Sequence, residues 1–382
     1  MRIPLSRPSL TQKELTAVGQ VFDSGWLGEG AWTASFEHAV AEYVGAPHVV
    51  AVNTGTSALH LALEALGVGP GDEVIVPTFT FVSDPVAVRM CGATPVFADI
   101  SPETLSLDPE DTARRITERT RVIMPTDYAG RPADVPSLRR IIGNREIRIV
   151  RDAAHSFGSL INGRPVGLSQ GEDATCFSFD PIKNLTCGEG GAVAVAHGSL
   201  ARELRERRNL GFRPGVRARS AGSAVAMRGV VSDGFRYHMS NINAAIGLAQ
   251  FGRLDDLLNG RRQVARWYDE LLRGCSEVRR FSRDYTQIVP FIYPVLVDPT
   301  VRDELIARFG QEGIHADLRY SLCHQEPLFG PGQPSLPHAE AVADSLLCLP
   351  IYTGLQYEQV CDVVSLLVHL LSSLRVVAGA QT

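Results

Sequence analysis

The sequence contains almost no lysine. Only Lys13 and Lys183 occur among its 37 basic residues, and the other 35 are arginines. Arginine therefore meets nearly every need for positive charge, and a retained lysine calls for a chemical reason. A lysine amine can lose its proton when it is desolvated and then attack a carbonyl carbon to form a Schiff base, whereas a guanidinium stays protonated.

Further absences exclude broad functional classes. The formal net charge of -5 provides no basic field for nucleic acid. The first residues, MRIPLSRPSL, lack the apolar core of a signal peptide, and the apolar run VVSLLVHLLSSLRVV is too short and too interrupted to span a membrane. The seven cysteines include no C-x-x-C pair, which indicates reduced thiols in a cytoplasmic protein. The ten histidines form no ligand-spaced cluster, so no metal site is expected.

Short β-branched runs alternate with helical patterns over the first 200 residues, which predicts an α/β fold with a mostly parallel sheet covered on both faces. Strands are expected within 48–55, 73–80, 94–100, 121–128, 147–155, 174–179 and 191–196, and helices near 57–66, 82–91 and 135–142. Ligands of such sheets bind beyond the carboxyl ends of the strands.

The second half predicts a smaller α/β domain. We expect a long helical stretch at 240–274, a strand at 288–297, and helices near 300–312, 338–347 and 356–374. The predicted division is a large domain at 1–250, including the N-terminal segment, and a small domain at 251–382. A loop rich in Gly, Ser and Arg at 212–234 is long enough to be functional or mobile.

Two strand ends carry candidate ligands of a charged group. Thr56 and Ser57 begin a predicted helix, where hydroxyl and free N–H groups favour a phosphate, although a plain N-cap is the simpler reading of this turn alone. Asp152 follows the run IRIV, so its carboxylate is expected to be partly buried near the end of a strand and to need a partner. That partner is either a protonated ring nitrogen or a structural arginine.

Two further strand ends complete a constellation. Ser178 lies in a predicted strand, and Lys183 follows between this aromatic run and the glycines of CGEGG. A lone loop lysine is usually a solvated charge, but the scarcity of lysine and the setting favour covalent chemistry. Phe81 is either core or a platform for a planar ring. Together these candidates describe a site for pyridoxal 5'-phosphate (PLP): a phosphate cradle, a buried aspartate, a lysine that can form a Schiff base, and an aromatic ring that can stack on the cofactor.

The chain resembles the DegT/DnrJ/EryC1/StrS family of PLP-dependent sugar aminotransferases. The resemblance covers nearly the whole chain and is carried by SRPSLTQKELTAV, SGWLGEG, VNTGTSALHLAL, GDEVIVPTFTFVS, YAGRPADV, RDAAHSFG, FSFDPIKNLTCGEGGAV, YHMSNINAAIGLAQ and LPIY. It implies the aspartate aminotransferase-like fold (fold type I). It also implies a homodimer with shared active sites, in which the partner supplies part of the phosphate site from GFRYHMSN.

The resemblance implies a role for each candidate residue. Lys183 holds the cofactor covalently, Asp152 contacts its ring nitrogen and His155 its ring hydroxyl, and PLP passes through pyridoxamine phosphate during turnover. The expected cofactor-binding set is Thr56, Ser57, Phe81, Asp152, His155, Ser178, Lys183 and Arg236. Arg236 and His238 stand where many relatives have asparagine and arginine, which leaves the cross-subunit contact open. Asp127 stands where relatives often have histidine, with a possible bearing on substrate choice.

The implied reaction moves an amino group from L-glutamate to a nucleotide-linked keto-sugar. The motif GEGGA is more similar to aminotransferases of 4-keto-6-deoxyhexoses than to the branch that makes 3-amino sugars. Amination of a 3-keto-sugar or a cyclitol ketone, or synthesis of aminohydroxybenzoate, stays open. Sugar dehydratases of the family carry histidine at the lysine position, so Lys183 argues against that reaction. The presence of both Lys183 and Asp152 argues against a non-catalytic regulatory paralogue.

Overall fold

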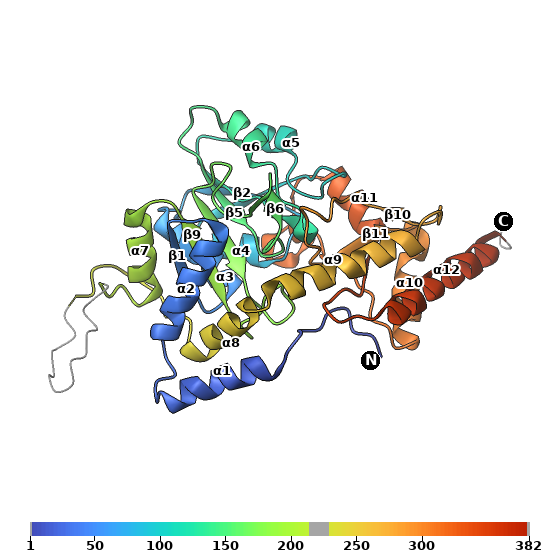
Figure 1. Cartoon of the computed structure of the whole chain (residues 1–382). Coiled ribbons are helices and arrows are strands. Elements are labelled where there is room, and N and C mark those ends of the chain that lie inside the picture. The colour runs from blue at the N-terminus through green and yellow to red at the C-terminus, as the bar shows by residue number, and fades with distance from the viewer. Residues whose placement is uncertain (1, 214–228, 380–382) are drawn as a thin grey trace.

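The computed structural model describes residues 2–213 and 229–379, so most of the loop expected at 212–234 lies outside the described residues. Its main feature is a seven-stranded sheet in the order β1-β9-β8-β5-β4-β2-β3 (Figure 1). The pairs from β8 to β3 are parallel, and β9 runs antiparallel to both of its neighbours. The predicted mostly parallel sheet is therefore confirmed.

The strands of this sheet are β1 (His48–Val52), β2 (Glu73–Pro77), β3 (Thr94–Ala98), β4 (Thr120–Ile123), β5 (Arg148–Asp152), β8 (Ala174–Ser178) and β9 (Gly191–Val195). The helices of the first half are α1 (Gln12–Asp23), α2 (Ala31–Val44), α3 (Gly55–Ala65), α4 (Ser83–Met90), α5 (Pro109–Arg115), α6 (Val135–Ile142) and α7 (Gly198–Arg208). A small hairpin joins β6 (Leu160–Ile161) to β7 (Arg164–Pro165).

Both faces of the large sheet are buried, because successive side chains of each strand point to opposite sides. Val50 and Val52 of β1 pack in a core with α3, α4 and α7. Val49 and Ala51 of the same strand pack on the other face, in a core that includes α2. Burial on both faces explains why these strands are continuous apolar runs.

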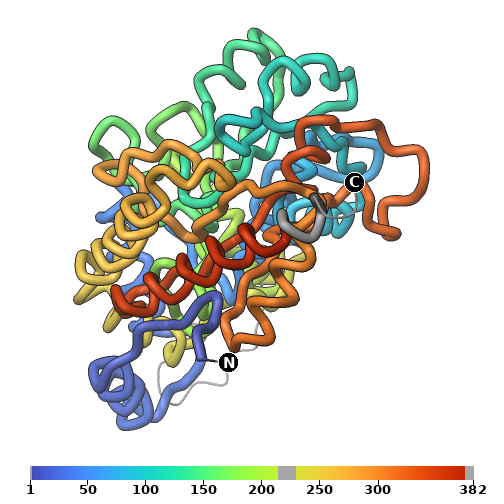
Figure 2. The backbone as a smooth tube through the Cα atoms, turned by 90° about the vertical axis from the view of Figure 1, so that its right-hand side faces the viewer, coloured from blue at the N-terminus to red at the C-terminus, as the bar shows by residue number. Residues whose placement is uncertain are grey.

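The C-terminal part contains a second, three-stranded antiparallel sheet in the order β10-β11-β12. Its elements, with the helices that lead to it, are α8 (Asn241–Phe251), α9 (Leu254–Leu271), β10 (Arg279–Arg280), β11 (Tyr293–Leu296), α10 (Pro299–Gln311), α11 (Pro337–Ser345), β12 (Leu346–Leu349) and α12 (Tyr357–Gly379). Figure 2 shows α12 in red crossing this part of the molecule, with α10 in orange beside it.

The N-terminal segment lies against the C-terminal part. Ile3 forms a parallel bridge with Ile314, and its carbonyl accepts a hydrogen bond from His315 N. Ile3 is also buried in the core formed by α9, α10 and α12. The division at residues 250 and 251 stays a prediction; it falls at the end of α8.

Three expected elements differ from the structure. The helical stretch at 240–274 is two helices, which are separated at Gly252 and Arg253. The expected strand at 288–297 pairs only over β11, because Pro290 lacks an N–H group and Val289 N–H donates instead to Ser159 Oγ at 2.9 Å. The helix expected near 338–347 ends earlier, because residues 346 and 347 belong to β12. The pairing of β12 with β11 and its burial in the core outweigh the helical pattern.

No helix within residues 2–213 and 229–379 combines the length and the apolar character needed to cross a membrane. All seven cysteines are free thiols in the structure.

Candidate active site

A cavity of about 230 Å³ opens at the carboxyl ends of the parallel strands. Residues that follow β1, β2, β5 and β8 line it together with Arg319 and Tyr320 from the C-terminal part. Six of the predicted residues line this cavity: Thr56, Phe81, Asp152, His155, Ser178 and Lys183. Residues that are far apart in sequence thus meet at one site.

One end of the cavity is formed by the N-terminus of α3. Thr54 caps this helix by accepting a hydrogen bond from Ser57 N at 3.0 Å. Any Cβ at Gly55 would lie 2.8 Å from Ser178 Cβ, so only glycine lets the helix end meet the end of β8. This close approach places the Thr56 and Ser178 hydroxyls beside free backbone N–H groups, which is a suitable cradle for a phosphate.

Ser57 does not line the cavity, although the sequence predicts it as a phosphate ligand. It is buried, and its hydroxyl accepts a hydrogen bond from Thr54 Oγ1 at 2.9 Å. Ser57 is thus bonded to the capping residue Thr54, which itself lines the cavity, and the role of Ser57 as a phosphate ligand stays a prediction.

Asp152 is the last residue of β5 and is only 5% exposed. Its Oδ1 accepts a hydrogen bond from Ala154 N at 2.9 Å. No arginine among the described residues pairs with it, and the adjacent Arg151 pairs instead with Glu172 at 2.8 Å and Asp127 at 3.4 Å. Burial raises the pKa of Asp152, while the Ala154 N–H and Lys183 oppose this rise. A cationic ring nitrogen in the cavity would supply the missing partner.

Lys183 lies on the turn after β8 and faces the same cavity. Its Nζ is 4.1 Å from the centre of the Phe291 ring. Burial lowers the pKa of Lys183 to about 8, although Asp152 and Asp180 favour its charged form. At a pKa of about 8, roughly a tenth of the amine is neutral at pH 7 and able to act as a nucleophile.

His155 is buried and holds a neutral ring. Ala129 N–H donates to its Nδ1 at 3.4 Å, which places the ring proton on Nε2, 3.1 Å from the Tyr320 hydroxyl. The ring also stacks on Phe291 at 4.2 Å between centres. Burial, Lys183 and Arg319 lower the pKa of His155 well below its usual range. His155 therefore offers an N–H donor to an oxygen atom bound in the cavity.

Sequence reasoning missed several residues that line the cavity. These are Asp180, Glu189, Arg319 and Tyr320, in addition to Thr54. Glu189 belongs to the GEGG motif, so the sequence could have indicated it as a site residue. Arg319 and Tyr320 lie in a segment without a recognisable motif. Asp127 is fully buried and bonds to Ser156 Oγ at 2.6 Å and Arg151, so it lies behind the cavity and does not contact a substrate there.

Arg236 is exposed and does not line the cavity of its own chain. Its segment is anchored by Val52, which bridges His238, and by Asn53 N–H, which donates to Tyr237 O at 2.8 Å. These contacts place Arg236 near the end of β1 but turn it to the surface. A contact with the cofactor of a second subunit stays a prediction.

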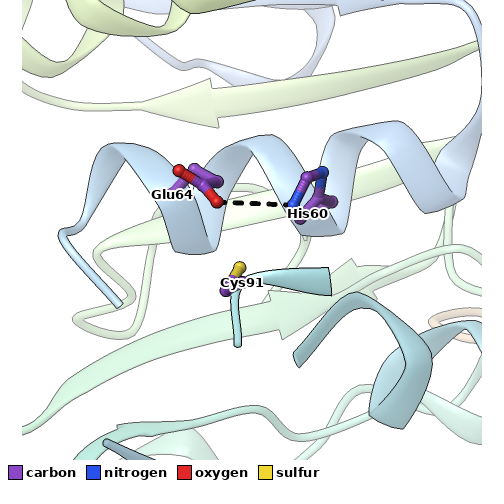
Figure 3. Close-up of side chains that lie close together, drawn as sticks. All are labelled: His60, Glu64 and Cys91. Atoms are coloured by element: carbon purple, nitrogen blue, oxygen red, sulfur yellow. Dashed lines mark ion pairs between the residues drawn. The ribbon is translucent and has the colours of Figure 1, made fainter. Parts of the chain in front are cut away.

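A separate polar cluster joins His60 and Glu64 of α3 to Cys91 after α4 (Figure 3). Their nitrogen, oxygen and sulfur atoms lie within 4.8 Å of one another, which the sequence alone did not indicate. The groups lie close to partners: His60 Nε2 is 3.5 Å from Glu64, His60 Nδ1 is 3.1 Å from the Tyr237 hydroxyl, and Arg207 is 3.3 Å from Glu64. The cluster thereby anchors the segment that carries Arg236.

The cavity residues fit PLP in kind and arrangement. The α3 terminus, Thr56 and Ser178 would hold the phosphate, Asp152 the ring nitrogen, and Lys183 the aldehyde carbon. Phe81, which is 50% exposed and 5.3 Å from Tyr320 between ring centres, presents an aromatic surface to the cavity.

Solved structures share this architecture over the whole chain. The aminotransferase TlmJ from Streptoalloteichus hindustanus is 33% identical, with a TM-score of 0.90 over 98% of this chain and 100% of that chain. DesI, solved in the presence of its TDP-sugar product, is 30% identical, with a TM-score of 0.87 over 100% and 96%. The PLP form of the putative sugar aminotransferase Spr1654 from Streptococcus pneumoniae is 28% identical, with a TM-score of 0.88 over 97% and 99%.

Fold and site together define a PLP-dependent transaminase of fold type I. Residues 8–368 match the DegT/DnrJ/EryC1/StrS aminotransferase family. The chain belongs to this family.

Proposed function

We propose that this enzyme transfers the amino group of L-glutamate to a nucleotide-linked 4-keto-6-deoxyhexose and forms an amino-sugar. The observation that carries the proposal is the placement of Lys183 and Asp152 in one cavity, with the lysine amine partly neutral. DesI, a relative at 30% identity, has a TDP-sugar as its product. Glu189 of the GEGG motif lines the same cavity, which supports a role for this motif in substrate choice.

The residues divide the work of the reaction. The helix terminus, Thr56 and Ser178 bind the phosphate, and Phe81 covers one face of the ring. The Asp152 carboxylate keeps the ring nitrogen protonated, and the His155 N–H donates to the ring hydroxyl. PLP, when bound, supplies an electron sink and carries the amino group between the two halves of the reaction. Lys183 would hold the aldehyde carbon of PLP, and its free amine would move a proton at the substrate carbon.

A screen of acceptors tests this proposal. Purified protein with bound PLP is mixed with L-glutamate and, separately, with nucleotide-linked 4-keto-sugars, 3-keto-sugars and cyclitol ketones, and the products are identified by mass spectrometry. We expect 2-oxoglutarate and an amino-sugar only with a nucleotide-linked 4-keto-6-deoxyhexose. Amination of only a 3-keto-sugar or a cyclitol, or loss of a hydroxyl without amino transfer, would contradict the assignment. Lys183→Ala protein is the control.

We further propose that the enzyme is a cytoplasmic homodimer. Leu10, Leu15, Phe22, Trp26 and Leu27 gather in one N-terminal segment around α1 and are between 42% and 63% exposed. Large exposed apolar groups that are close together in this way are typical of a surface that another subunit covers. A dimer would also give the exposed Arg236 a role, since Arg236 does not line the cavity of its own chain.

Mixing the inactive Lys183→Ala variant with the weakened Arg236→Ala variant, at a PLP concentration that limits the latter, tests whether Arg236 acts across the dimer. Arg236→Ala is expected to weaken PLP binding by about 1.5–3 kcal/mol, as expected for the loss of a charged hydrogen bond. When Lys183→Ala and Arg236→Ala chains are mixed, a mixed dimer has one site without either residue and one intact site, so activity should exceed that of both parents. Arg202→Ala, at another exposed arginine, is the matched control for affinity. Unchanged affinity and no recovery on mixing would remove Arg236 from the phosphate site.

A further inference from the structure

A second carboxyl group lies directly behind Asp152. Asp84, in the first turn of α4, is fully buried. Its Oδ2 accepts hydrogen bonds from Thr80 Oγ1 and Thr126 Oγ1, both at 2.7 Å. The backbone of Thr126 is itself bridged to that of Asp152. Two threonine hydroxyls thus fix the Asp84 carboxyl against the residue that faces the cavity.

The other oxygen of Asp84 receives no hydrogen bond. Asp84 Oδ1 is buried, and no described donor reaches it. The Asp152 carboxyl is within hydrogen-bonding reach of Asp84. Two carboxyl groups can form a hydrogen bond only if one of them carries a proton, and a buried polar atom without a donor indicates that it is itself the donor.

The surroundings of Asp84 favour its neutral form. No described cation pairs with it, and the neighbouring thiols Cys176 and Cys323 have pKa values that burial raises. Lys183 of the same cavity favours the charged form of Asp152. Burial and the charge of Asp152 raise the pKa of Asp84 well above its usual range. The hydrogen bond from Asp84 conversely lowers the pKa of Asp152.

We propose that Asp84 is a positioning residue that stays a neutral carboxylic acid and donates the hydrogen of Oδ1 to the Asp152 carboxylate. The pair then carries one negative charge, which matches the single positive charge of a protonated ring nitrogen. Asp84 also orients the Asp152 carboxylate, because Asp84 itself is held by Thr80 and Thr126. The inference rests on the proposed contact between Asp152 and the ring nitrogen.

Two substitutions at Asp84 separate this role from a purely structural one. Asp84→Asn keeps a neutral group whose amide N–H donates to Asp152 and whose oxygen accepts from the threonines, so PLP affinity should stay within about threefold of the original. Asp84→Ala removes the donor, and PLP affinity should fall about tenfold or more. Equal losses in both variants would overturn the proposal, since a neutral donor would then be insufficient.

A cofactor analogue supplies the control for folding. In 1-deazapyridoxal phosphate a carbon atom replaces the ring nitrogen, so it cannot form the charged hydrogen bond with Asp152. We expect Asp84→Ala and the original protein to bind this analogue equally. An equal loss for PLP and the analogue would show that Asp84 only supports the fold, and would overturn the proposal.

Infrared difference spectra of the apoprotein locate the proton without any substrate or cofactor. With carbon-13 aspartate, the protein at neutral pH should show a protonated carboxyl band that is absent from Asp84→Asn and retained in Asp152→Asn. The opposite assignment, with the band lost only in Asp152→Asn, would place the proton on Asp152 and refute the proposal. Because no keto-sugar is involved, failure here is distinguishable from failure of the proposed reaction.

Discussion

Lys183→Arg is expected to abolish covalent attachment of the cofactor and to lower turnover by about 10⁴-fold or to background. The substitution keeps a positive charge beside Phe291 and Asp152, so the fold should be retained. It removes the amine whose pKa is lowered to about 8 and replaces it with a guanidinium that stays protonated. Borohydride reduction followed by peptide mass spectrometry measures attachment, and formation of 2-oxoglutarate measures turnover.

Lys13→Arg is the matched control, because Lys13 is the other lysine of the chain and lies exposed on α1. Lys13→Arg should leave both the covalent attachment of the cofactor and the turnover unchanged. The pH dependence provides a second check: only the neutral amine attacks the aldehyde, so the attachment rate should rise as the pH increases through about 8. Substantial amino transfer by Lys183→Arg would refute the role of Lys183.

Asp152→Asn is expected to lower turnover about tenfold or more while PLP remains bound. The amide keeps the shape of the side chain but loses the charge that stabilises a protonated ring nitrogen. Loss of one charged hydrogen bond corresponds to about 1.5–3 kcal/mol. The measurement is the single-turnover rate of the half-reaction with L-glutamate, in which the chemical step limits the rate.

Asp23→Asn is a suitable control, since Asp23 is exposed at the end of α1. It also removes one carboxylate from the chain but does not line the cavity, and its rate should be unchanged. An unchanged single-turnover rate in Asp152→Asn would exclude Asp152 from the chemistry and leave its buried carboxylate without a function.

Much of the fold was predictable because the relevant signals are local. The β-branched runs at 48–52 and 73–77 and the apolar helix face at 59–66 form the expected elements. Where local signals conflict, the prediction was wrong: the run at 346–349 follows a helix and forms β12 because β11 offers its backbone a partner. Pairing between distant strands is a tertiary effect that periodicity does not encode.

The candidate site divides in the same way. Lys183, Asp152, Ser178 and Thr56 were predicted as site residues because each ends or follows a strand or begins a helix, whereas His155 was predicted from the family resemblance alone. Ser57 as a phosphate ligand stays a prediction; only the structure shows that its backbone N–H donates to the capping Thr54 hydroxyl. Arg319 and Tyr320 arrive from the C-terminal part, more than 100 residues beyond Lys183, and only folding reveals them.

The sequence by itself determined which residue types are available for the reaction. These are a lysine in a chain that otherwise uses arginine, a carboxylate at the end of a strand, and the motifs that place the chain in its family. These depend on residue type and on short spacings, which a chain carries before it folds. Tertiary structure alone decided which groups touch. The meeting of Asp84 with Asp152, the lowered pKa of Lys183 and the neutral ring of His155 all arise from burial and proximity, because desolvation and hydrogen bonding act between residues that only the folded chain brings together.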